Sequence, residues 1–168
     1  MKAIVCTRYG SPDVLQLKEV NKPIHNKNEV LVKIHATTVG SEDIRVRGFK
    51  SPILLWIPMR IVLGLRKPRQ PILGVELAGE VEQIGKNVKL FKKGNQVFAL
   101  TGMSLGAHAE YTCLHENAII SEKPSNMTFE EAAAVPMGGT TALYFLRKGK
   151  IEKGKKVLIY GASGLQGL

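Results

Sequence analysis

A Gly-x-x-Gly-x-x-Gly pattern at residues 161–167 directly follows the apolar run Val-Leu-Ile-Tyr at residues 157–160. Short runs of this kind form buried strands. Glycines between a strand and a helix let the backbone turn sharply and approach a pyrophosphate, whose charge then lies on the first N–H groups of the helix. The pattern therefore predicts a dinucleotide-binding turn, with a flexible tail of small residues as the alternative. The residues that this turn would bring to the ligand are Gly161, Ala162, Ser163, Gly164 and Gly167.

The 168 residues end one position after the last of these glycines. The helix behind the turn, and the charged residue about 20 positions later that holds the ribose, would lie beyond Leu168. Without that helix, the aligned N–H groups and the dipole that attract a pyrophosphate are missing. We therefore expect the chain to bind a dinucleotide weakly or not at all and to be inactive by itself.

Zinc is bound in proteins by clustered thiolates and imidazoles. The chain has four histidines and two cysteines, and the histidines show no ligand spacing to a carboxylate or a thiol. Cys6 and Cys113 are too few for a four-cysteine zinc site and too isolated for a disulfide framework. We therefore expect no metal site. His35 and His108 lie in strand patterns and are interpreted as hydrogen-bonded barrel residues. Residues 1–6 enter a strand pattern without a signal peptide, which together with reduced cysteines predicts a cytoplasmic protein.

The net charge of +10 raises the question of an acidic partner. The densest basic segment, residues 66–69, has no interleaved aromatic residues and no DNA-reading helix, so we expect no nucleic-acid binding. Residues 53–65 form the most apolar segment, but Pro58 and Arg60 interrupt it and it is too short to cross a bilayer. We expect a short helix packed on the core there, or a lip over a substrate cleft, and no contact with a membrane.

Most of the first 124 residues read as short strands separated by turns that contain glycine or proline. In one of them apolar and polar residues alternate and place Val30, Val32, Ile34 and Ala36 on one face. Many short strands with frequent turns favour a compact β-barrel over alternating strands and helices. The predicted strands are residues 3–7, 15–20, 29–37, 77–85, 96–100 and 107–113.

The pattern changes from strands to helices near residue 124. Thr128 and Glu131 have the spacing of a capping box, in which each side chain accepts a hydrogen bond from the backbone N–H of the other. Alanines extend this helix, Pro136 is expected to end it, and a second helix is predicted over residues 138–148. The sequence therefore predicts a mainly β chain with helices, an α+β fold, divided into residues 1–124 and 125–168.

Several segments, in this order, resemble the medium-chain dehydrogenase/reductase superfamily, in particular its quinone oxidoreductase-like and alcohol dehydrogenase-like members. The resemblance covers nearly the whole chain. It implies an N-terminal GroES-like barrel that shapes the substrate cleft, followed by a Rossmann domain that holds NADPH or NADH. The second part of the chain would then be the incomplete beginning of that Rossmann domain. The segments that carry the resemblance are residues 39–48, 73–81, 94–97, 109–111, 130–134, 138–142 and 161–164.

The resemblance also bears on zinc. Zinc-dependent members place cysteine, histidine and cysteine or aspartate on the metal, and the matching positions here are Gly40, Val75 and Met137. None of these residues binds zinc, so the resemblance implies a zinc-free enzyme. The chemistry left without a Lewis acid is hydride transfer from NADPH to a quinone or enone, because a conjugated acceptor spreads the incoming charge itself.

Site residues follow from the matched motifs. Asp43 and Arg47 are catalytic candidates in the cleft, although an Asp–Arg pair that fixes a loop is an equal alternative. Glu76 matches the carboxylate of the family's Gly-x-Glu motif and is expected to order the site rather than react. Thr141 matches a threonine that contacts the nicotinamide, and the alternative is a helix hydroxyl bonded to its own backbone.

We therefore expect the N-terminal part of a zinc-free, NAD(P)H-dependent quinone or enone reductase. Two alternatives stay open: a cofactor-free GroES-like module that binds a partner or ligand, and a non-functional gene fragment. The strand at residues 157–160 would have unpaired edges, and the helices before it carry apolar faces. Such surfaces favour pairing with another chain, so we expect a homodimer, or a tail folded across the cleft.

Overall fold

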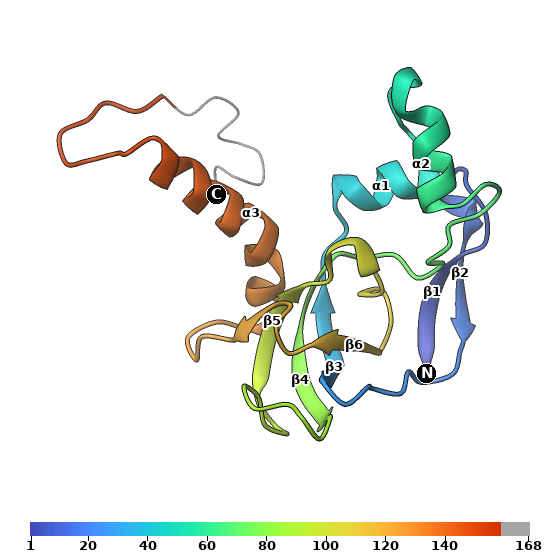
Figure 1. Cartoon of the computed structure of the whole chain (residues 1–168), viewed down its shortest axis with the longest axis horizontal. Coiled ribbons are helices and arrows are strands. Elements are labelled where there is room, and N and C mark those ends of the chain that lie inside the picture. The colour runs from blue at the N-terminus through green and yellow to red at the C-terminus, as the bar shows by residue number, and fades with distance from the viewer. Residues whose placement is uncertain (159–168) are drawn as a thin grey trace.

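The computed structural model describes residues 1–158 and shows a mixed α+β fold (Figure 1). In this part of the chain the strands are β1 (Lys2–Cys6), β2 (Leu15–Glu19), β3 (Glu29–Thr37), β4 (Glu76–Ile84), β5 (Gln96–Leu100), β6 (Tyr111–His115) and β7 (Ile119–Glu122). The helices are α1 (Ser41–Gly48), α2 (Trp56–Leu63) and α3 (Phe129–Lys148), with short 3₁₀ turns η1 (Pro12–Val14), η2 (Ile53–Leu55) and η3 (Gly102–Ser104).

The larger sheet has the strand order β6-β3-β4-β5-β7, with each neighbouring pair antiparallel, and it curls into a half-barrel (Figure 1). β1 and β2 form a separate antiparallel pair, which bridges to the rest through Ala3–Ala109 and Val5–Ile72. The concave side of the large sheet is filled by apolar side chains, because alternate residues of each strand point inward. This core contains Val30, Val32, Leu77, Val81, Phe91, Val97, Ala99, Ala107 and Leu114.

The six strands predicted within residues 1–124 are present, with three differences. β6 begins at Tyr111, whereas the prediction began at residue 107; Ala107 is buried and Ala109 bridges Ala3, so these residues carry a strand-like pattern without a strand. β7 is absent from the prediction because its four residues lie beside a turn. Ala36 also leaves the predicted face: the register of β3 against β4 shifts after Ile34, and Ala36 packs in a second cluster beneath α3.

α3 is one continuous helix, so the prediction that Pro136 separates two helices was wrong. The predicted capping box is confirmed: the Thr128 N–H donates to Glu131 Oε2 at 2.8 Å, and the Glu131 N–H donates to Thr128 Oγ1 at 3.2 Å. Buried Ala132 and Ala133 hold the first half of the helix against β4 and its neighbours. A proline inside a helix removes one backbone hydrogen bond, and its ring clashes with the carbonyl of the preceding turn. The packing of Ala132 and Ala133 offsets this loss of stability.

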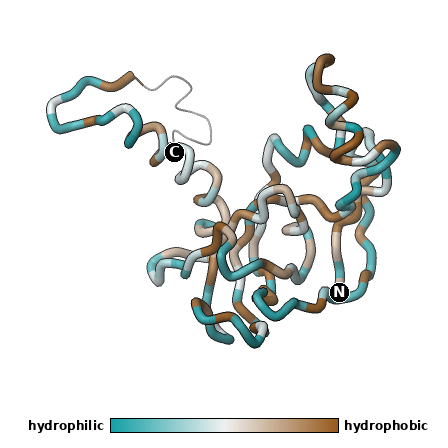
Figure 2. The backbone as a smooth tube through the Cα atoms, viewed as in Figure 1, coloured by the Kyte–Doolittle hydropathy of each residue, from teal (hydrophilic) through white to brown (hydrophobic). Residues whose placement is uncertain are grey.

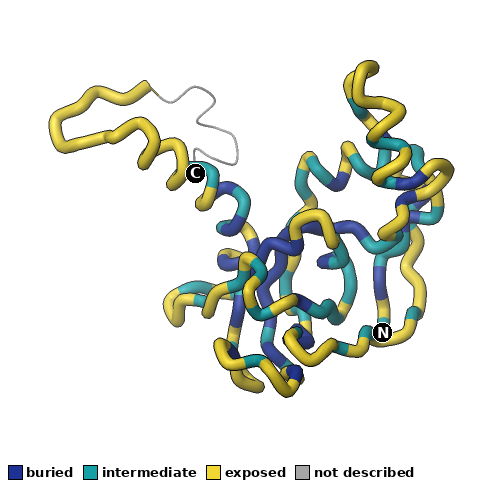
Figure 3. Tube along the Cα trace, viewed as in Figure 1, coloured by how far each residue is buried: buried dark blue, intermediate teal, exposed yellow. Residues whose placement is uncertain are grey.

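α2 projects from the upper right of the molecule, and none of its residues is buried (Figures 1 and 3). The expectation that residues 53–65 pack on the core is therefore wrong, whereas the alternative of a lip is supported by the pocket described below. Within residues 1–158, no helix combines the length and the apolar character needed to span a bilayer.

The two cysteines are free, and Cys6 is fully buried beside Val14 and Leu73. Burial raises the pKa of the Cys113 thiol to about 11 and also raises the pKa of Cys6. Both side chains therefore remain protonated thiols at neutral pH, which makes them poor nucleophiles and poor metal ligands.

Replacing Gly79 with alanine is expected to lower the free energy of unfolding by about 1–3 kcal/mol, the usual cost of overpacking a core. Gly79 is buried in β4, and a Cβ there would lie 2.1 Å from the Lys33 carbonyl oxygen of β3. Denaturant unfolding followed by circular dichroism measures the change. The control is Gly48→Ala at the end of α1, where the nearest atom to a new Cβ is 3.7 Å away and alanine favours the helix. Equal losses in the two variants would contradict this close approach of strands.

Candidate functional site

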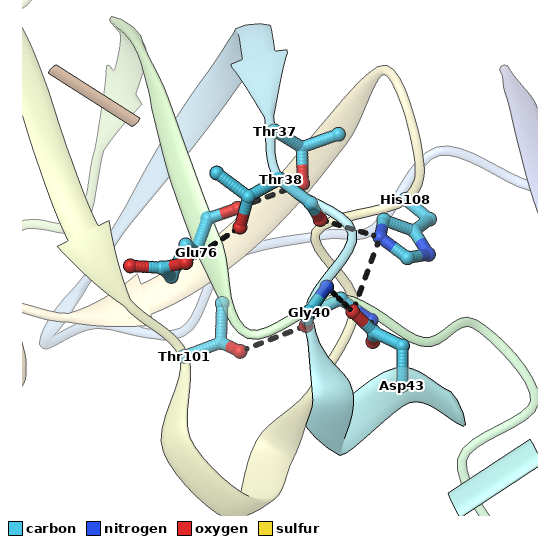
Figure 4. Close-up of polar contacts among 8 residues, drawn as sticks. Thr37, Thr38, Gly40, Asp43, Glu76, Thr101 and His108 are labelled. Atoms are coloured by element: carbon cyan, nitrogen blue, oxygen red, sulfur yellow. Dashed lines mark hydrogen bonds and ion pairs between the residues drawn. The ribbon is translucent and has the colours of Figure 1, made fainter. Parts of the chain in front are cut away.

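The candidate site lies at the end of the half-barrel where β3 ends and β4 begins (Figure 4). α3 packs against β3, β4 and β5. Thr37 closes β3, and Glu76 opens β4 opposite Leu100, the last residue of β5. The loop from β3 to α1 and the segment before β4 meet at the same end. Side chains from four segments that are distant in the sequence therefore converge here.

Glu76 is 3% exposed and connects three of these segments. Its Oε2 accepts a hydrogen bond from Thr38 Oγ1 at 2.6 Å, and its Oε1 accepts one from the Met137 N–H at 2.7 Å. Its backbone oxygen accepts a further bond from Thr37 Oγ1 at 2.7 Å. Both carboxylate oxygens are thus occupied, which is the arrangement of a residue that orders its neighbours.

The position of Met137 explains how a carboxylate can reach a helix backbone. Pro136 has no N–H, and its ring pushes away the carbonyl one turn earlier, so the hydrogen-bond ladder of α3 is open at this point. Side chains enter helices at such openings. Glu76 does so here, and Thr140 Oγ1 donates to the Pro136 carbonyl oxygen from the next turn.

Asp43 is also buried, and its carboxylate fixes the backbone of two loops. Its Oδ2 accepts from the Gly40 N–H at 2.9 Å, which caps α1, and its Oδ1 accepts from the Gly74 N–H at 2.8 Å. Gly74 has a φ of +94°, and a Cβ there would lie 2.6 Å from the His108 ring, so glycine is required. The Gly74 carbonyl oxygen in turn accepts from Thr101 Oγ1 at 3.1 Å.

His108 completes this network (Figure 4). Its Nε2 lies 3.0 Å from the Thr38 carbonyl oxygen and 3.9 Å from Asp43 Oδ2. A carbonyl only accepts, so Nε2 carries the proton. The prediction of a hydrogen-bonded histidine is confirmed for His108, which lies outside any strand. His35 differs, because it is exposed and its ring stacks on Phe129 at a centroid distance of 4.4 Å.

Arg47 does not pair with Asp43 in the described part of the chain. Its Nη1 donates to the Gly10 carbonyl oxygen at 2.9 Å, and the Gly10 N–H donates back to the Arg47 carbonyl oxygen. Arg47 therefore fixes the loop after β1 by itself, and the alternative of an Asp43–Arg47 pair is not seen among the described residues. Asp43 and Arg47 both line a first pocket of about 640 Å³, between β1–β2 and the end of β3.

A second pocket of about 490 Å³ lies between α1, α2, η3 and α3, and its lining is mostly apolar. Three methionines face it, which are polarisable side chains that fit flat apolar molecules. Leu55, Met59 and Leu63 of α2 and its preceding turn form one wall, so this segment is a lip over the pocket. The remaining lining includes Val46, Phe49, Val75, Leu100, Met103, Leu105 and Met137, with Arg45 and Lys50 beside them.

Two of the three positions that would carry zinc ligands, Val75 and Met137, line this second pocket. The third, Gly40, is bonded to Asp43 one residue before α1. These residues supply no thiolate, imidazole or carboxylate, so the donor set does not fit zinc. Among residues 1–158, no group of three histidine, cysteine or acidic side chains is arranged to hold a metal ion.

Thr141 lies on α3, half-buried, four residues after Met137. Residues four apart share one face of a helix, so Thr141 lies on the Met137 side of α3. Gly161, Ala162, Ser163, Gly164 and Gly167 lie outside the described residues. Val157 and Leu158, the described start of the predicted strand, are exposed and outside any strand.

The sequence-based search missed Thr38, Thr101, Met59 and Met103. Single threonines and methionines give no pattern that separates a site from a loop or a core. These residues come together only because the fold brings segments that are distant in the sequence to the same end of the sheet.

Replacing Glu76 with glutamine is expected to lower the free energy of unfolding by about 1–3 kcal/mol, because an amide nitrogen cannot accept from Thr38 or Met137. Denaturant titration measures the loss. Glu80→Gln, on the same strand, is the matched control and should change little, since Glu80 has no hydrogen-bond or ion-pair partner among residues 1–158. If Glu76→Gln left the free energy of unfolding unchanged, this would contradict the role of Glu76 in connecting β4 to Thr38 and α3.

The comparisons with known proteins agree with this geometry. The alcohol dehydrogenase GroES-like domain family matches residues 26–125, more than half of the chain. A 2-methylene-furan-3-one reductase from Solanum lycopersicum is 34% identical over 172 residues, covering 98% of this chain and 41% of its own. The quinone oxidoreductase from Coxiella burnetii matches with a TM-score of 0.84 and 29% identity, over 99% of this chain and 50% of that one. The Escherichia coli quinone oxidoreductase complexed with NADPH matches with a TM-score of 0.72 and 28% identity, over 89% of this chain and 41% of that one.

The chain spans about half the length of the curated relatives it matches. Its fold superposes on the quinone oxidoreductase structure over nearly the whole of this chain. The chain therefore belongs to the alcohol dehydrogenase GroES-like family, within the medium-chain dehydrogenase/reductase superfamily.

Proposed function

We propose that the chain is the substrate-side part of a zinc-free, NAD(P)H-dependent oxidoreductase that transfers hydride to a quinone or an enone. The observation that carries this proposal is the second pocket, which is apolar where zinc-dependent relatives would need metal ligands. An apolar slot with methionine and phenylalanine side chains suits a flat conjugated carbonyl compound. The similarity to quinone oxidoreductases and to an enone reductase supports the same substrate class.

NAD(P)H would supply the hydride when bound. The chain's own residues hold the acceptor and exclude water, and hydride transfer needs this positioning more than it needs an acid or a base. The charged residues that line the second pocket are Glu42, Arg45 and Lys50, and the two cations would place positive charge near the oxygen that gains electrons. Glu76 and Asp43 keep the walls in place and are positioning residues in this proposal.

For the cofactor, we propose that residues 125–168 begin the dinucleotide-binding part and that residues 1–124 form the substrate-side part. Thr141, on the Met137 side of α3, is the described residue that we assign to the nicotinamide. The NADPH bound by the Escherichia coli relative supports the cofactor type. The glycines at 161–167 remain the proposed contacts to its phosphates.

A quinone is expected to quench the fluorescence of Trp56, the single tryptophan of the chain, in a saturable way. The Trp56 ring contacts Phe49 at a centroid distance of 5.8 Å, and Phe49 lines the second pocket. Titration with 1,4-naphthoquinone measures binding without any cofactor. Met103→Glu should weaken it by about tenfold or more, because a carboxylate in an apolar pocket is costly.

The matched control is Leu90→Glu, since Leu90 is also exposed but lies away from the pocket. It should bind the quinone as the parent chain does. Quenching that rises linearly with quinone concentration, to the same extent in both variants, would contradict the proposed substrate pocket.

We also propose that the chain forms a homodimer through the second half of α3. Leu143, Tyr144, Phe145 and Leu146 are all about half exposed or more, which leaves an apolar surface uncovered in the described residues. Phe145→Ser is expected to shift a dimer to a monomer in light scattering, whereas Leu90→Ser, of similar exposure, should not. A monomeric parent chain would contradict this proposal.

A further inference from the structure

The outward side of α2 and of η2 before it is apolar and uncovered. Ile53 is 95% exposed, Leu54 88% and Ile57 67%, far more than large aliphatic side chains usually are. The segment is brown in Figure 2 and yellow in Figure 3, so hydrophobic and exposed residues coincide at the end that projects farthest. Ile61, Val62 and Leu65 continue the same surface.

This exposure does not come from a loose attachment. The Arg60 guanidinium lies 3.9 Å from the centre of the Phe49 ring and also over the rings of Tyr9 and Trp56. The Tyr9 hydroxyl donates to the Gly64 carbonyl oxygen at 2.9 Å. The base of α2 is therefore held to the body, while Leu55, Met59 and Leu63 face the second pocket and the opposite side faces outward.

The charged residues of the sequence segment that carries this surface are all of one sign. Between Ile44 and Val75 the sequence has no aspartate or glutamate. Arg66, Lys67 and Arg69, directly after the helix, are exposed. The seven basic residues of this stretch are Arg45, Arg47, Lys50, Arg60, Arg66, Lys67 and Arg69.

We propose that α2, together with η2 and the basic residues 66–69, docks on an anionic lipid bilayer. A short helix with exposed aliphatic residues, a tryptophan and adjacent basic residues lies in the interface plane, with apolar side chains among the acyl chains and cations at the lipid phosphates. The surface touches the bilayer without spanning it. This proposal revises the sequence-based expectation of no membrane contact. That expectation considered residues 53–65 as a helix packed on the core, as a lip over a cleft or as a membrane span, and did not consider a helix lying on the membrane surface.

A second copy of the chain fits this surface less well. A symmetric contact would bring the basic residues of both copies to one interface, and like charges at an interface oppose association. An anionic lipid surface covers the apolar residues and neutralises the basic ones together.

Docking of α2 would also bring the second pocket to the bilayer. Its lip would lie in the interface, so a quinone or enone dissolved in lipid could enter the pocket without crossing water. This consequence rests on the proposed function, whereas the docking itself does not.

The test uses Trp56, which is 46% exposed at the start of α2. Vesicles of phosphatidylcholine and phosphatidylserine in equal amounts should shift its emission to shorter wavelength, and lipids with brominated acyl chains should quench it. Vesicles of phosphatidylcholine alone should give a much smaller effect at the same lipid concentration. No shift with the anionic vesicles would overturn the proposal.

Two charge variants separate a local surface from the overall charge of +10. Arg66→Gln, Lys67→Gln and Arg69→Gln together should weaken binding to the anionic vesicles by roughly a hundredfold, since each basic residue near such a surface contributes about fivefold. The control replaces three other exposed lysines, Lys86, Lys92 and Lys93, with glutamine. If both triple variants lost the same amount of vesicle binding, this would contradict docking through α2.

The apolar contribution is tested by Ile57→Glu, with Ile24→Glu as the control at another exposed isoleucine. Only the first should abolish the shift of Trp56 emission.

Other occupants give different results. A blue shift that grows with protein concentration without lipid would identify a second copy, and a shift caused by a single-stranded oligonucleotide would identify nucleic acid; either would overturn the proposal. These measurements need neither cofactor nor quinone. Their failure would therefore leave the saturable quinone quenching, and with it the proposed function, intact.

Discussion

A buried carboxylate that reaches from a strand into a helix holds this molecule together at its functional end. Glu76 accepts hydrogen bonds from Thr38 in the loop after β3 and from the backbone of Met137 in α3. A buried charged group is stabilising only when its hydrogen-bonding capacity is filled, and here both oxygens are used. The walls of the second pocket depend on this contact, because Val75 precedes Glu76 and Met137 lies on α3.

The proline in α3 takes part in the same interaction. Pro136 opens the hydrogen-bond ladder of α3 beside Met137. The Met137 N–H can therefore donate to the Glu76 carboxylate, which offsets part of the cost of a proline in a helix. The helix survives because Ala132 and Ala133 pack closely against Ala78 of β4. Small side chains on both elements allow this approach, and Gly79 allows the equally close approach of β3 and β4.

α2 has the opposite character. It lies outside the core, held at its base by Arg60 and Tyr9, and contributes one side to the pocket while the other side stays uncovered. One side of α2 therefore lines the second pocket, and its other side forms part of the outer surface of the protein. Between Ile44 and Val75 the sequence has seven basic residues and no acidic one, so this region carries an excess of positive charge. The proposed substrate pocket and the proposed docking surface thus share one short helix.

Local patterns in the sequence determined much of the fold. Alternation of apolar and polar residues located β3, Thr128 and Glu131 located the start of α3, and matched motifs led to Asp43 and Glu76. Contacts between distant residues decided the rest. Pro136 ends an isolated helix, but packing on the sheet keeps α3 continuous. Arg47 holds Gly10 rather than Asp43 because the fold places that loop beside α1. The outward apolar side of α2 is equally a tertiary property: the sequence determines that these residues are apolar, and only the arrangement of the surrounding elements determines which of them remain uncovered.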